Sequence, residues 1–309
     1  MIVRAPASTA NLGPGFDALG LAVDLPFDVW VPDVAAGADA AGAAGADAAG
    51  DGADDAGAGV AGPVADVESG DVPPAGFLVA EENHPAAIAH RAAGGSGELW
   101  WRSPIPPGRG LGFSGAAAVA GAFAATRDRE AAFEVAAEVE GHPDNAAPST
   151  HGGFCVTAGD ATIRLDPPTG VDLVVWWPAT TTSTRRSRAA LPEEVSFADA
   201  AFNVGRAALL VAAVAAGRLD AWDAGTRDRL HQDRRLELAP ESADVLDRCR
   251  EHGALGAWLS GSGPTVAALC APETTGALLA ALAGSGTARS LGLCDDGVRV
   301  VNPDQSGRL

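Results

Sequence analysis

The sequence predicts an α+β protein that is large enough for two domains. Segments typical of helices and strands follow one another without strict β-α alternation, which argues against a purely parallel sheet. With 309 residues, 47% of them hydrophobic, the chain can bury one large core or two medium ones.

Strands are expected where apolar residues alternate or run together, and helices where Ala and Leu dominate or proline opens the first turn. The expected strands cover residues 2–5, 27–33, 153–158, 162–165, 171–177, 255–260, 265–270 and 298–301. The expected helices cover 82–94, 115–126, 128–141, 196–216, 219–230 and 241–252. Residues 34–62 are almost pure Ala, Gly and Asp, so we expect a disordered or loosely ordered acidic insert.

Charge and cysteine content exclude several classes of protein. The formal charge of −19 repels nucleic acid and anionic membranes, so we expect neither as a partner. We also expect no apolar run near the roughly 18 residues of a membrane span and no signal peptide. The four cysteines form no C-x-x-C pair, which favours free thiols in the cytoplasm over a disulfide or zinc site.

Residues 103–115 carry the strongest indication of function. Four glycines and a serine lie directly before an Ala-rich run that should form a helix. Glycines let the backbone turn tightly and approach a ligand, and the first amides of the helix then point outward at the positive end of its dipole. The segment therefore predicts a site for a nucleotide or another phosphate ester, although so acidic a chain needs local arginine or a metal ion there.

Two well-known phosphate-binding loops, the Walker A loop and the dinucleotide fingerprint, do not match residues 103–115 in full. A Walker A loop ends in Gly-Lys-Ser/Thr, and this chain contains no lysine. Residues 110–115 match the dinucleotide fingerprint G-x-G-x-x-G, and Glu130 lies about 20 residues further on. However, three prolines within 104–107 occupy the place of the buried strand that must precede that fingerprint. A flexible loop that only caps the helix is the remaining alternative.

Two other segments place polar side chains at turns. Residues 6–17 put Asn11 and Asp17 on a Gly/Pro turn after a strand, although an ordinary Asx-rich turn looks the same. Residues 138–145 gather carboxylates, an imidazole and an amide, which suits a metal ion and a hydroxyl-bearing substrate. That segment also fits a plain helix C-terminus with Gly141 as its cap.

A second glycine turn and two arginine clusters complete the set. Residues 260–265 form a tight glycine turn between two apolar strands. The arginines within 185–188 and 234–235 would be natural carboxylate clamps in so acidic a chain, although any one of them could be plain surface charge.

Taken in order, these motifs resemble the GHMP family of small-molecule kinases. P-x-S-x-A-N-L-G-x-G-F-D spans residues 6–17, P-x-x-x-G-L-G-x-S spans 106–114 and S-G-S-G-P-T spans 260–265. Within the family, E-G-H-P-D-N-x-A-P at 140–148 and the segment 230–235 are similar to the homoserine kinase group. The likeness covers nearly the whole chain except residues 34–75.

The resemblance implies the two-domain GHMP kinase fold. An N-terminal nucleotide-binding domain, like ribosomal S5 domain 2, would span residues 1–155, and a ferredoxin-like C-terminal domain would span 156–309. It also implies ATP and Mg²⁺, and phosphorylation of the L-homoserine hydroxyl to O-phospho-L-homoserine, a step toward threonine. The expected partner is this small molecule; a homodimer is compatible with the sequence but not indicated by it.

The resemblance further assigns nucleotide and metal roles. The loop around the ATP phosphates would comprise Pro106, Gly108, Arg109, Gly110, Leu111, Gly112, Ser114 and Gly115. Glu138 would hold Mg²⁺, with Glu140 as the alternative.

Substrate roles follow from the same resemblance. The amino and hydroxyl ends of homoserine would contact Asn11, Asp17, His142, Asp144 and Asn145. Arg188 and Arg235 would hold its carboxylate, and Thr184 would lie near the transferred phosphoryl group. Asn145, Thr184 and Glu138 would thus be the catalytic residues. Members of this group are thought to lack a strong base, which phosphoryl transfer tolerates because positioning and charge neutralisation supply most of the rate.

Two residues depart from the usual G-L-G-S-S-A of the family. Phe113 removes a hydroxyl and adds bulk beside the phosphates, and Gly115 replaces a better helix former. Two rival functions therefore stay open, a GHMP kinase for another small alcohol and a non-catalytic ligand-binding relative. The clamps at Arg188 and Arg235 favour a substrate with a carboxylate, and Asp17 and Asp144 could meet an ammonium group.

Overall fold

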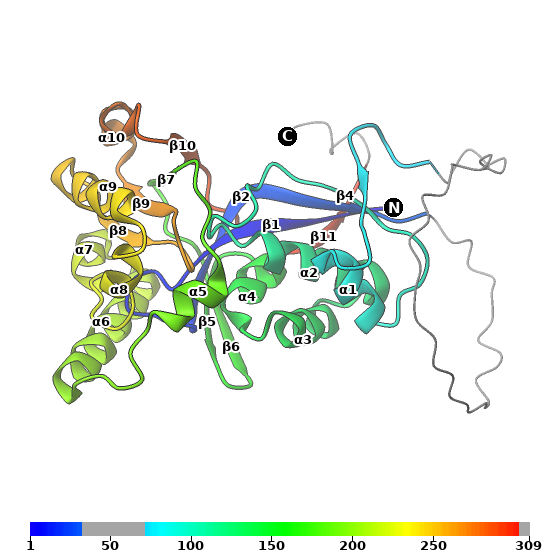
Figure 1. Ribbon diagram of the computed structural model, residues 1–309, viewed down its shortest axis with the longest axis horizontal. Helices are drawn as coiled ribbons and strands as arrows, with labels where there is room; N and C mark the ends of the chain where they lie inside the picture. The colour runs from blue at the N-terminus through cyan, green and yellow to red at the C-terminus, as the bar shows by residue number, and fades with distance from the viewer. Residues whose placement is uncertain (33–71, 303–309) are drawn as a thin grey trace, which may run out of the picture.

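The structure is a computed structural model, and it describes residues 1–32 and 72–302. The predicted insert at 34–62 lies outside the described residues. Figure 1 shows two lobes along the long axis of the molecule, each built on its own sheet, with helices packed on it.

The first lobe contains a seven-stranded sheet in which neighbouring strands run antiparallel. Its main path runs β11-β1-β2-β4-β3, and β5 pairs with both β2 and β6. The strands are β1 (Ile2–Ala10), β2 (Leu19–Trp30), β3 (Leu78–Val79), β4 (Trp100–Arg102), β5 (Phe154–Ala158), β6 (Ala161–Leu165) and β11 (Arg299–Val301). Helices α1 (Pro85–Ala92), α2 (Phe113–Thr126), α3 (Arg129–Glu140) and α4 (Pro143–His151) lie together beside this sheet (Figure 1).

Small side chains let α2 lie at the centre of the first lobe. Residues 115–124 are all buried, and most of them are Ala or Gly. A Cβ atom at Gly121 would overlap the carbonyl oxygen of Ala86 in α1, so glycine permits the close contact of these two helices. The N-terminus of α2 points toward the second lobe.

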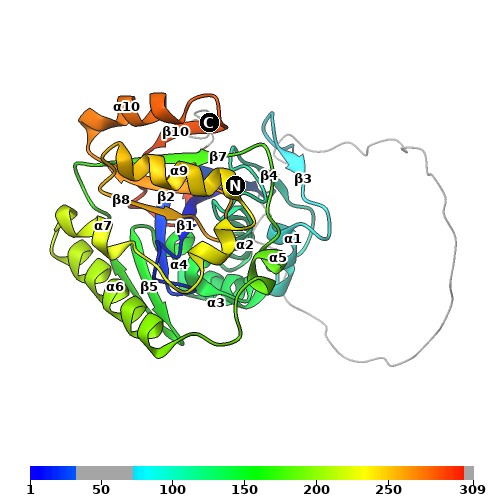
Figure 2. The same ribbon diagram turned by 60° about the vertical axis from the view of Figure 1, so that its left-hand side comes forward.

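The second lobe contains a four-stranded antiparallel sheet in the order β10-β7-β9-β8. The strands are β7 (Asp172–Trp177), β8 (Gly256–Leu259), β9 (Val266–Cys270) and β10 (Thr287–Leu291). The helical segments are α5 (Thr184–Ala189), α6 (Phe197–Ala215), the 3-10 turn η1 (Leu219–Ala221), α7 (Trp222–Gly225), α8 (Gln232–Leu236), α9 (Pro240–Glu251) and α10 (Pro272–Leu282). Helices α9 and α10 pack on one face of this sheet, and Figure 2 shows α10 at the top of the lobe and α6 and α7 below the sheet.

One large hydrophobic cluster spans the two lobes. Along β7, Val174 and Trp176 face the cluster under α9 and α10, whereas Val175 and Trp177 belong to the large cluster that also contains Leu111 of the first lobe. This alternation is what the two-residue period of a strand produces. Both faces of the second sheet are therefore covered, and the lobes are joined by buried side chains.

Mixed helices and antiparallel sheets confirm the α+β prediction. The predicted domain boundary after residue 155 falls inside β5, and two segments from the predicted C-terminal domain, 161–165 and 299–301, pair within the first sheet. Sheet membership therefore groups these two segments with the first lobe, and the division into domains at 155/156 stays a prediction.

The predicted helix over 219–230 is wrong. Only a 3-10 turn and the four-residue α7 form there, and α7 ends at Gly225. Beyond it, the Asp228 carboxylate accepts hydrogen bonds from the amides of Leu230, His231 and Gln232. Such side-chain acceptors favour a turn over a continuous helix. The shorter elements β3, β4 and α5, and also α4, α10 and β10, were not predicted.

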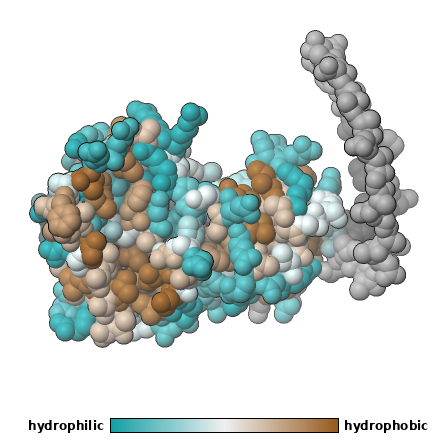
Figure 3. Space-filling view, turned by 90° about the horizontal axis from the view of Figure 1, so that it is seen from below, coloured by the Kyte–Doolittle hydropathy of each residue, from teal (hydrophilic) through white to brown (hydrophobic). Residues whose placement is uncertain are grey.

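Helix α6 is apolar on average, but Asp199, Asn203 and Arg206 interrupt its apolar residues, so it is not a continuous apolar run. Among the described residues, it is the helix that is long and apolar enough to cross a membrane by length and composition alone. It packs against α7 through a buried side that includes Leu210 and Ala213. In Figure 3, hydrophobic side chains gather on the lobe that carries α6.

Candidate active site

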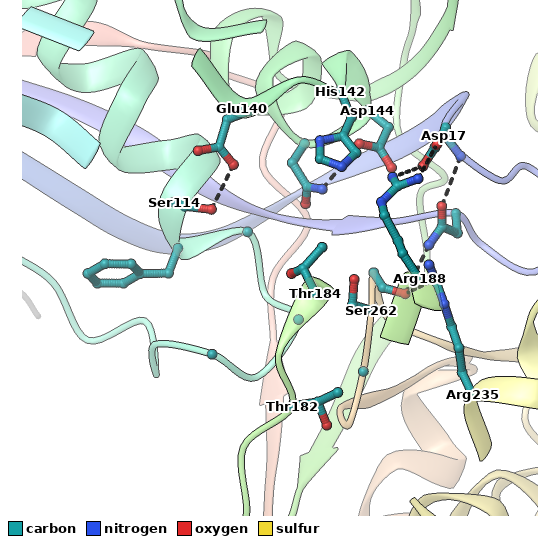
Figure 4. A pocket seen from close by; sticks show the side chains of 18 residues that line it. Asp17, Ser114, Glu140, His142, Asp144, Thr182, Thr184, Arg188, Arg235 and Ser262 are labelled. Atoms are coloured by element: carbon teal, nitrogen blue, oxygen red, sulfur yellow. Dashed lines mark hydrogen bonds and ion pairs between the residues drawn. The ribbon is translucent and has the colours of Figure 1, made fainter. Parts of the chain in front are cut away.

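A pocket of about 300 Å³ opens between the two lobes and gathers most of the residues singled out from the sequence (Figure 4). It is lined by Asn11, Asp17, Gly108, Gly110, Gly112, Phe113, Ser114, Glu140, His142, Asp144, Asn145, Thr182, Thr184, Arg188, Arg235, Gly261, Ser262 and Gly263. These residues come from six separate stretches of the chain, so the pocket exists only in the folded protein.

The glycine loop of residues 108–112 forms one wall together with the turn at 260–265. Gly110 has a φ of 80°, and a Cβ atom there would overlap the carbonyl oxygen of Ser260. The Ser260 hydroxyl donates to the Gly110 carbonyl at 2.6 Å. The two glycine turns of the sequence therefore fit against each other backbone to backbone, which only glycine allows.

The N-terminus of α2 opens into this pocket. Gly112 precedes the helix with a φ of 66°, and no side chain caps that end within the described part of the chain. The first amides of a helix have no partner inside it and carry the positive end of its dipole. An anionic ligand such as phosphate can therefore replace the missing cap.

Ser114 and Glu140 face each other at the same end of the pocket (Figure 4). The Ser114 hydroxyl donates to Glu140 Oε2 at 2.7 Å. Burial raises the pKa of Glu140, against the opposing effects of this hydrogen bond and of His142. A partly buried carboxylate and a neighbouring hydroxyl, beside the uncapped end of α2, supply the oxygen ligands that Mg²⁺ prefers.

Glu138, the residue expected to hold a metal, is absent from the pocket lining. It is exposed on α3, two residues before Glu140 and thus about 200° around the helix from it. No cluster of three or more His, Cys, Asp or Glu side chains suited to a metal occurs within residues 1–32 and 72–302. A metal that binds mainly through substrate phosphates needs no such cluster.

The two departures from the family motif have structural explanations. The Phe113 ring packs edge-on against Phe27, with centroids 5.3 Å apart, and against Trp101 at 5.6 Å. It therefore belongs to an aromatic cluster as well as to the pocket wall. A Cβ atom at Gly115 would lie 3.0 Å from Cβ of Asn145, so glycine lets α2 approach α4 closely.

Asp17 and Arg188 form a bidentate ion pair across the pocket (Figure 4). Arg188 donates to the two carboxylate oxygens at 2.6 and 3.0 Å. The turn that carries Asp17 is held by Asn11, whose Oδ1 accepts from the Asp17 amide at 3.0 Å. Asn11 Nδ2 in turn donates to the Gly261 carbonyl at 2.9 Å, which ties the first motif to the last.

Arg235 lies almost fully buried on α8 and reaches the pocket without a carboxylate partner in the described chain. Its NH1 donates to the Gly261 carbonyl at 3.0 Å and contacts His231 Nδ1 at 3.3 Å, and its Nε has no partner. Burial, with Arg188 nearby, lowers its pKa to about 10. An uncompensated buried cation is suited to an anionic ligand.

Asp144 and Asn145 lie in the first turn of α4 and line the pocket. Asn145 Oδ1 accepts from the Ser8 hydroxyl at 3.0 Å, and Asn145 Nδ2 donates to Asp144 at 3.2 Å. Burial, and then the negative charge of Asp17, raise the pKa of Asp144 to about 6. The carboxylates of Asp144 and Asp17 are thus suited to a cationic group.

Thr184 lies at the start of α5 and lines the pocket, close to Thr182. The Thr182 amide donates to the Gly108 carbonyl at 3.1 Å. The Arg109 side chain donates to the carbonyl oxygens of Pro178 and Ala179, which ties the glycine loop to the segment before Thr184.

Most of the residues predicted for the site reach the pocket, and a few do not. Those that line it are Asn11, Asp17, Gly108, Gly110, Gly112, Ser114, His142, Asp144, Asn145, Thr184, Arg188 and Arg235. Those outside the lining are Pro106, Arg109, Leu111, Gly115 and Glu138. The pocket is also lined by residues without a predicted role, namely Thr182, Gly261, Ser262 and Gly263. The last three belong to the glycine turn at 260–265, and Phe113, noted from the sequence only as a departure from the motif, lines the pocket as well.

The arrangement can hold a phosphate ester at one end and a small zwitterion at the other. Amides of α2, Ser114 and Glu140 form the first end, and the paired carboxylates and arginines form the second. Asn145 and Thr184 lie between them. Phosphoryl transfer in such a site does not require a strong general base, because positioning and charge neutralisation supply most of the rate.

Comparisons with known proteins agree with this geometry. The model of the GHMP kinases N terminal domain matches residues 83–153, and that of the GHMP kinases C terminal matches residues 210–286. The homoserine kinase of Moorella thermoacetica is 38% identical over 327 aligned residues, which cover 97% of this chain and 99% of that protein. The homoserine kinase of Deinococcus radiodurans is 39% identical, over 89% of this chain and 85% of that protein.

A solved structure shows the same fold. The crystal structure of homoserine kinase from Cytophaga hutchinsonii superposes with a TM-score of 0.72 at 23% identity, and the match covers 97% of both chains. The predicted two-domain architecture of this fold family is confirmed by these matches.

Proposed function

Because this chain belongs to the GHMP kinase family, we propose that it is a homoserine kinase. It transfers the γ-phosphoryl group of ATP to the hydroxyl of L-homoserine and forms ADP and O-phospho-L-homoserine. The observation that carries the proposal is the pocket itself. A phosphate-binding helix end faces two carboxylates and two arginines, in a chain 38% identical to a homoserine kinase over nearly its whole length.

The glycine loop and the N-terminus of α2 bind the ATP phosphates. Gly108, Gly110 and Gly112 line the pocket and leave room for phosphate oxygens beside their backbone. Pro106, Arg109, Leu111 and Gly115 support this loop from outside the pocket, Arg109 through its bonds to the carbonyls of Pro178 and Ala179.

Glu140 and Ser114 hold Mg²⁺ in this proposal. The partly buried carboxylate and the adjacent hydroxyl fit that cation, since Mg²⁺ takes one or two protein oxygens plus phosphate oxygens. When bound, the cation neutralises charge on the β- and γ-phosphates. Glu138, which the motif resemblance suggested first, lies on the solvent side of α3 and is not needed.

Homoserine binds at the opposite end as a zwitterion. Asp17 and Asp144 pair with its ammonium group, and Arg188 and Arg235 pair with its carboxylate. Asn11 and His142 complete this end. The hydroxyl then reaches toward Asn145 and Thr184, where it meets the γ-phosphate. Bringing both reactants together in this geometry supplies much of the rate.

A soluble enzyme of the cytoplasm, without nucleic-acid or membrane partners, fits this role. The net charge of −19 disfavours both kinds of partner. The long apolar helix α6 is anchored to the second lobe by buried Asn203, Leu210 and Ala213, as in a folded domain.

One assay panel tests the proposed function and its rivals. Coupled ADP release is measured with L-homoserine, L-serine, L-threonine and mevalonate, each with ATP and Mg²⁺. The proposal expects turnover with homoserine at the highest kcat/KM of the four. Faster turnover of another alcohol would make the chain a GHMP kinase with a different substrate. ATP binding without any turnover would support the non-catalytic relative.

A further inference from the structure

His231 is a buried side chain that no assigned role uses. It precedes α8 and is 1% exposed, and both ring nitrogens have partners. Its Nε2 lies 2.7 Å from the Gly13 carbonyl oxygen, and its Nδ1 lies 3.3 Å from NH1 of Arg235. Gly13 belongs to the first motif of the chain and Arg235 to the fourth, so the ring bridges two segments of the site.

The two partners determine which nitrogen carries the proton. A carbonyl oxygen can only accept, so Nε2 must donate to Gly13. A guanidinium can only donate, so Nδ1 must accept from Arg235. Both contacts thus require the neutral ring with its proton on Nε2. Burial lowers the pKa of His231, and Arg235 acts in the same direction, whereas Asp228, Gly13 and Asp17 act against it.

The contact with His231 fixes one edge of the Arg235 guanidinium. NH1 carries two protons, and its two partners are His231 Nδ1 and the Gly261 carbonyl. The Phe16 ring limits movement on another side, since its centroid lies 5.1 Å from Arg235 Cζ and 5.2 Å from the His231 ring. The NH2 group therefore remains for a ligand in the pocket.

From this geometry we propose that His231 is a positioning residue for carboxylate recognition. Its ring bonds to the Gly13 carbonyl on one side and to Arg235 on the other, so the Gly13 turn fixes where the guanidinium lies. The NH2 group of Arg235 is thereby held toward the substrate. The inference rests on the proposed function, because it assumes that Arg235 binds the carboxylate of homoserine. His231 itself touches neither substrate nor nucleotide.

Two substitutions of His231 by an amide residue distinguish the contribution of Nδ1 from that of Nε2. His231→Asn places its amide near Nδ1, where the oxygen can still accept from Arg235. His231→Gln places its amide near Nε2, where it can donate to Gly13 but leaves Arg235 without its acceptor. Each variant loses one hydrogen bond, so a purely structural role would affect both alike, whereas positioning of Arg235 would not.

Steady-state kinetics with homoserine and ATP provide the readout. We expect His231→Gln to raise the homoserine KM about tenfold, with kcat within about twofold, and His231→Asn to raise it less than about threefold. The ATP KM should stay within about twofold in both. In an Arg235→Leu background the two variants should have equal homoserine KM values, because the group that His231 positions is gone.

The outcomes distinguish this inference from the proposed function. Equal homoserine KM values for the two variants, in a wild-type enzyme that phosphorylates homoserine, overturn the inference alone. A wild-type chain without homoserine kinase activity overturns both. If neither variant folds, ¹⁵N NMR of the wild-type histidines decides. A neutral Nε2–H ring at His231, whose Nδ1 shift responds to added homoserine, supports the role; a charged ring or an Nδ1–H ring rejects it.

Discussion

The Arg188 guanidinium and the Asp17 carboxylate are joined by two hydrogen bonds of 2.6 and 3.0 Å, although 171 residues separate them in the chain. In the proposed complex each of these groups binds one end of homoserine. The ammonium and carboxylate of the substrate must therefore replace an ion pair that already exists. Both partners are about one-third exposed, so water and salt weaken this pair and make the exchange accessible.

Arg235 should matter more for substrate affinity than Arg188. Arg235 is buried and, among the residues that the structure describes, has no carboxylate partner to give up. A charged hydrogen bond is worth about 1.5–3 kcal/mol. Arg235→Leu should therefore raise the homoserine KM by about 10- to 150-fold. Arg188→Leu should raise it less than about tenfold, because it also frees Asp17 for the ammonium group. Initial rates over a range of homoserine concentrations compare the two, and an unchanged KM in Arg235→Leu removes that residue from the site.

Glu140 should be the carboxylate on which the metal depends. Glu140→Gln should lower kcat on the order of 100-fold and move the Mg²⁺ dependence of the rate to higher concentration, because a charged oxygen ligand is lost. Glu138→Gln is the matched control on the same helix and should behave like the wild type. Titration of Mg²⁺ at saturating ATP measures both. The opposite ranking would return the metal role to Glu138.

Asp144 should make homoserine use depend on pH. Because its pKa is about 6, it loses its charge as the pH falls, and the neutral form cannot pair with an ammonium group. We expect kcat/KM for homoserine to fall below pH 6 by up to roughly tenfold per pH unit. Asp144→Asn should have a lower kcat/KM that changes little across this range. A pH profile between 5 and 8 with the same slope in both proteins would assign the dependence to another group.

The same pKa predicts how Asp144 affects stability. A folded-state pKa above the ordinary 3.8 means that the protonated carboxyl is favoured by folding. Its stabilising contribution is therefore fully present below pH 4 and is lost as the pH rises through about 6. Asp144→Asn should thus gain stability relative to the wild type between pH 4 and pH 7, on the order of 2 kcal/mol. Urea unfolding at the two pH values measures this difference, which should be zero if the carboxyl is well solvated.

Phe113 should be a packing residue as much as a pocket residue. Phe113→Ser restores the usual letter of the family motif but removes a ring that contacts Phe27 and Trp101. We expect it to destabilise the protein by about 1–3 kcal/mol and to leave the ATP KM no lower than in the wild type. Thermal unfolding and ATP kinetics test this, with Phe113→Leu as the control that keeps apolar volume. A tighter ATP KM at unchanged stability would mean that Phe113 only crowds the phosphates.

Local sequence patterns were enough to find the glycine loop, and the family resemblance pointed to most of the other residues that line the pocket. Gly110 and Gly112 are recognisable because few other residues fit such turns, and their spacing before an Ala-rich run predicts a helix end. Several helices and buried strands were predictable for the same reason, since their periodicity lies within one segment. Residues 19–26 of β2 were missed, and the predicted helix over 219–230 ends at Gly225. Short elements such as α5 and β4 were missed, because a few residues carry little signal and depend on neighbours in space.

Tertiary structure decided what the sequence left open. Glu138 and Glu140 are the same residue type, two positions apart, and the sequence does not tell which of them reaches the site. The rotation of α3 about its axis as it packs against α2 brings Glu140, not Glu138, to Ser114. The pairing of Asp17 with Arg188, and the bridge from Gly13 through His231 to Arg235, join segments more than 150 residues apart. The sequence therefore determined the chemical groups and the turns that carry them. The packing of the two lobes against each other, through the large hydrophobic cluster that they share, determined which side chains of the pocket come into contact.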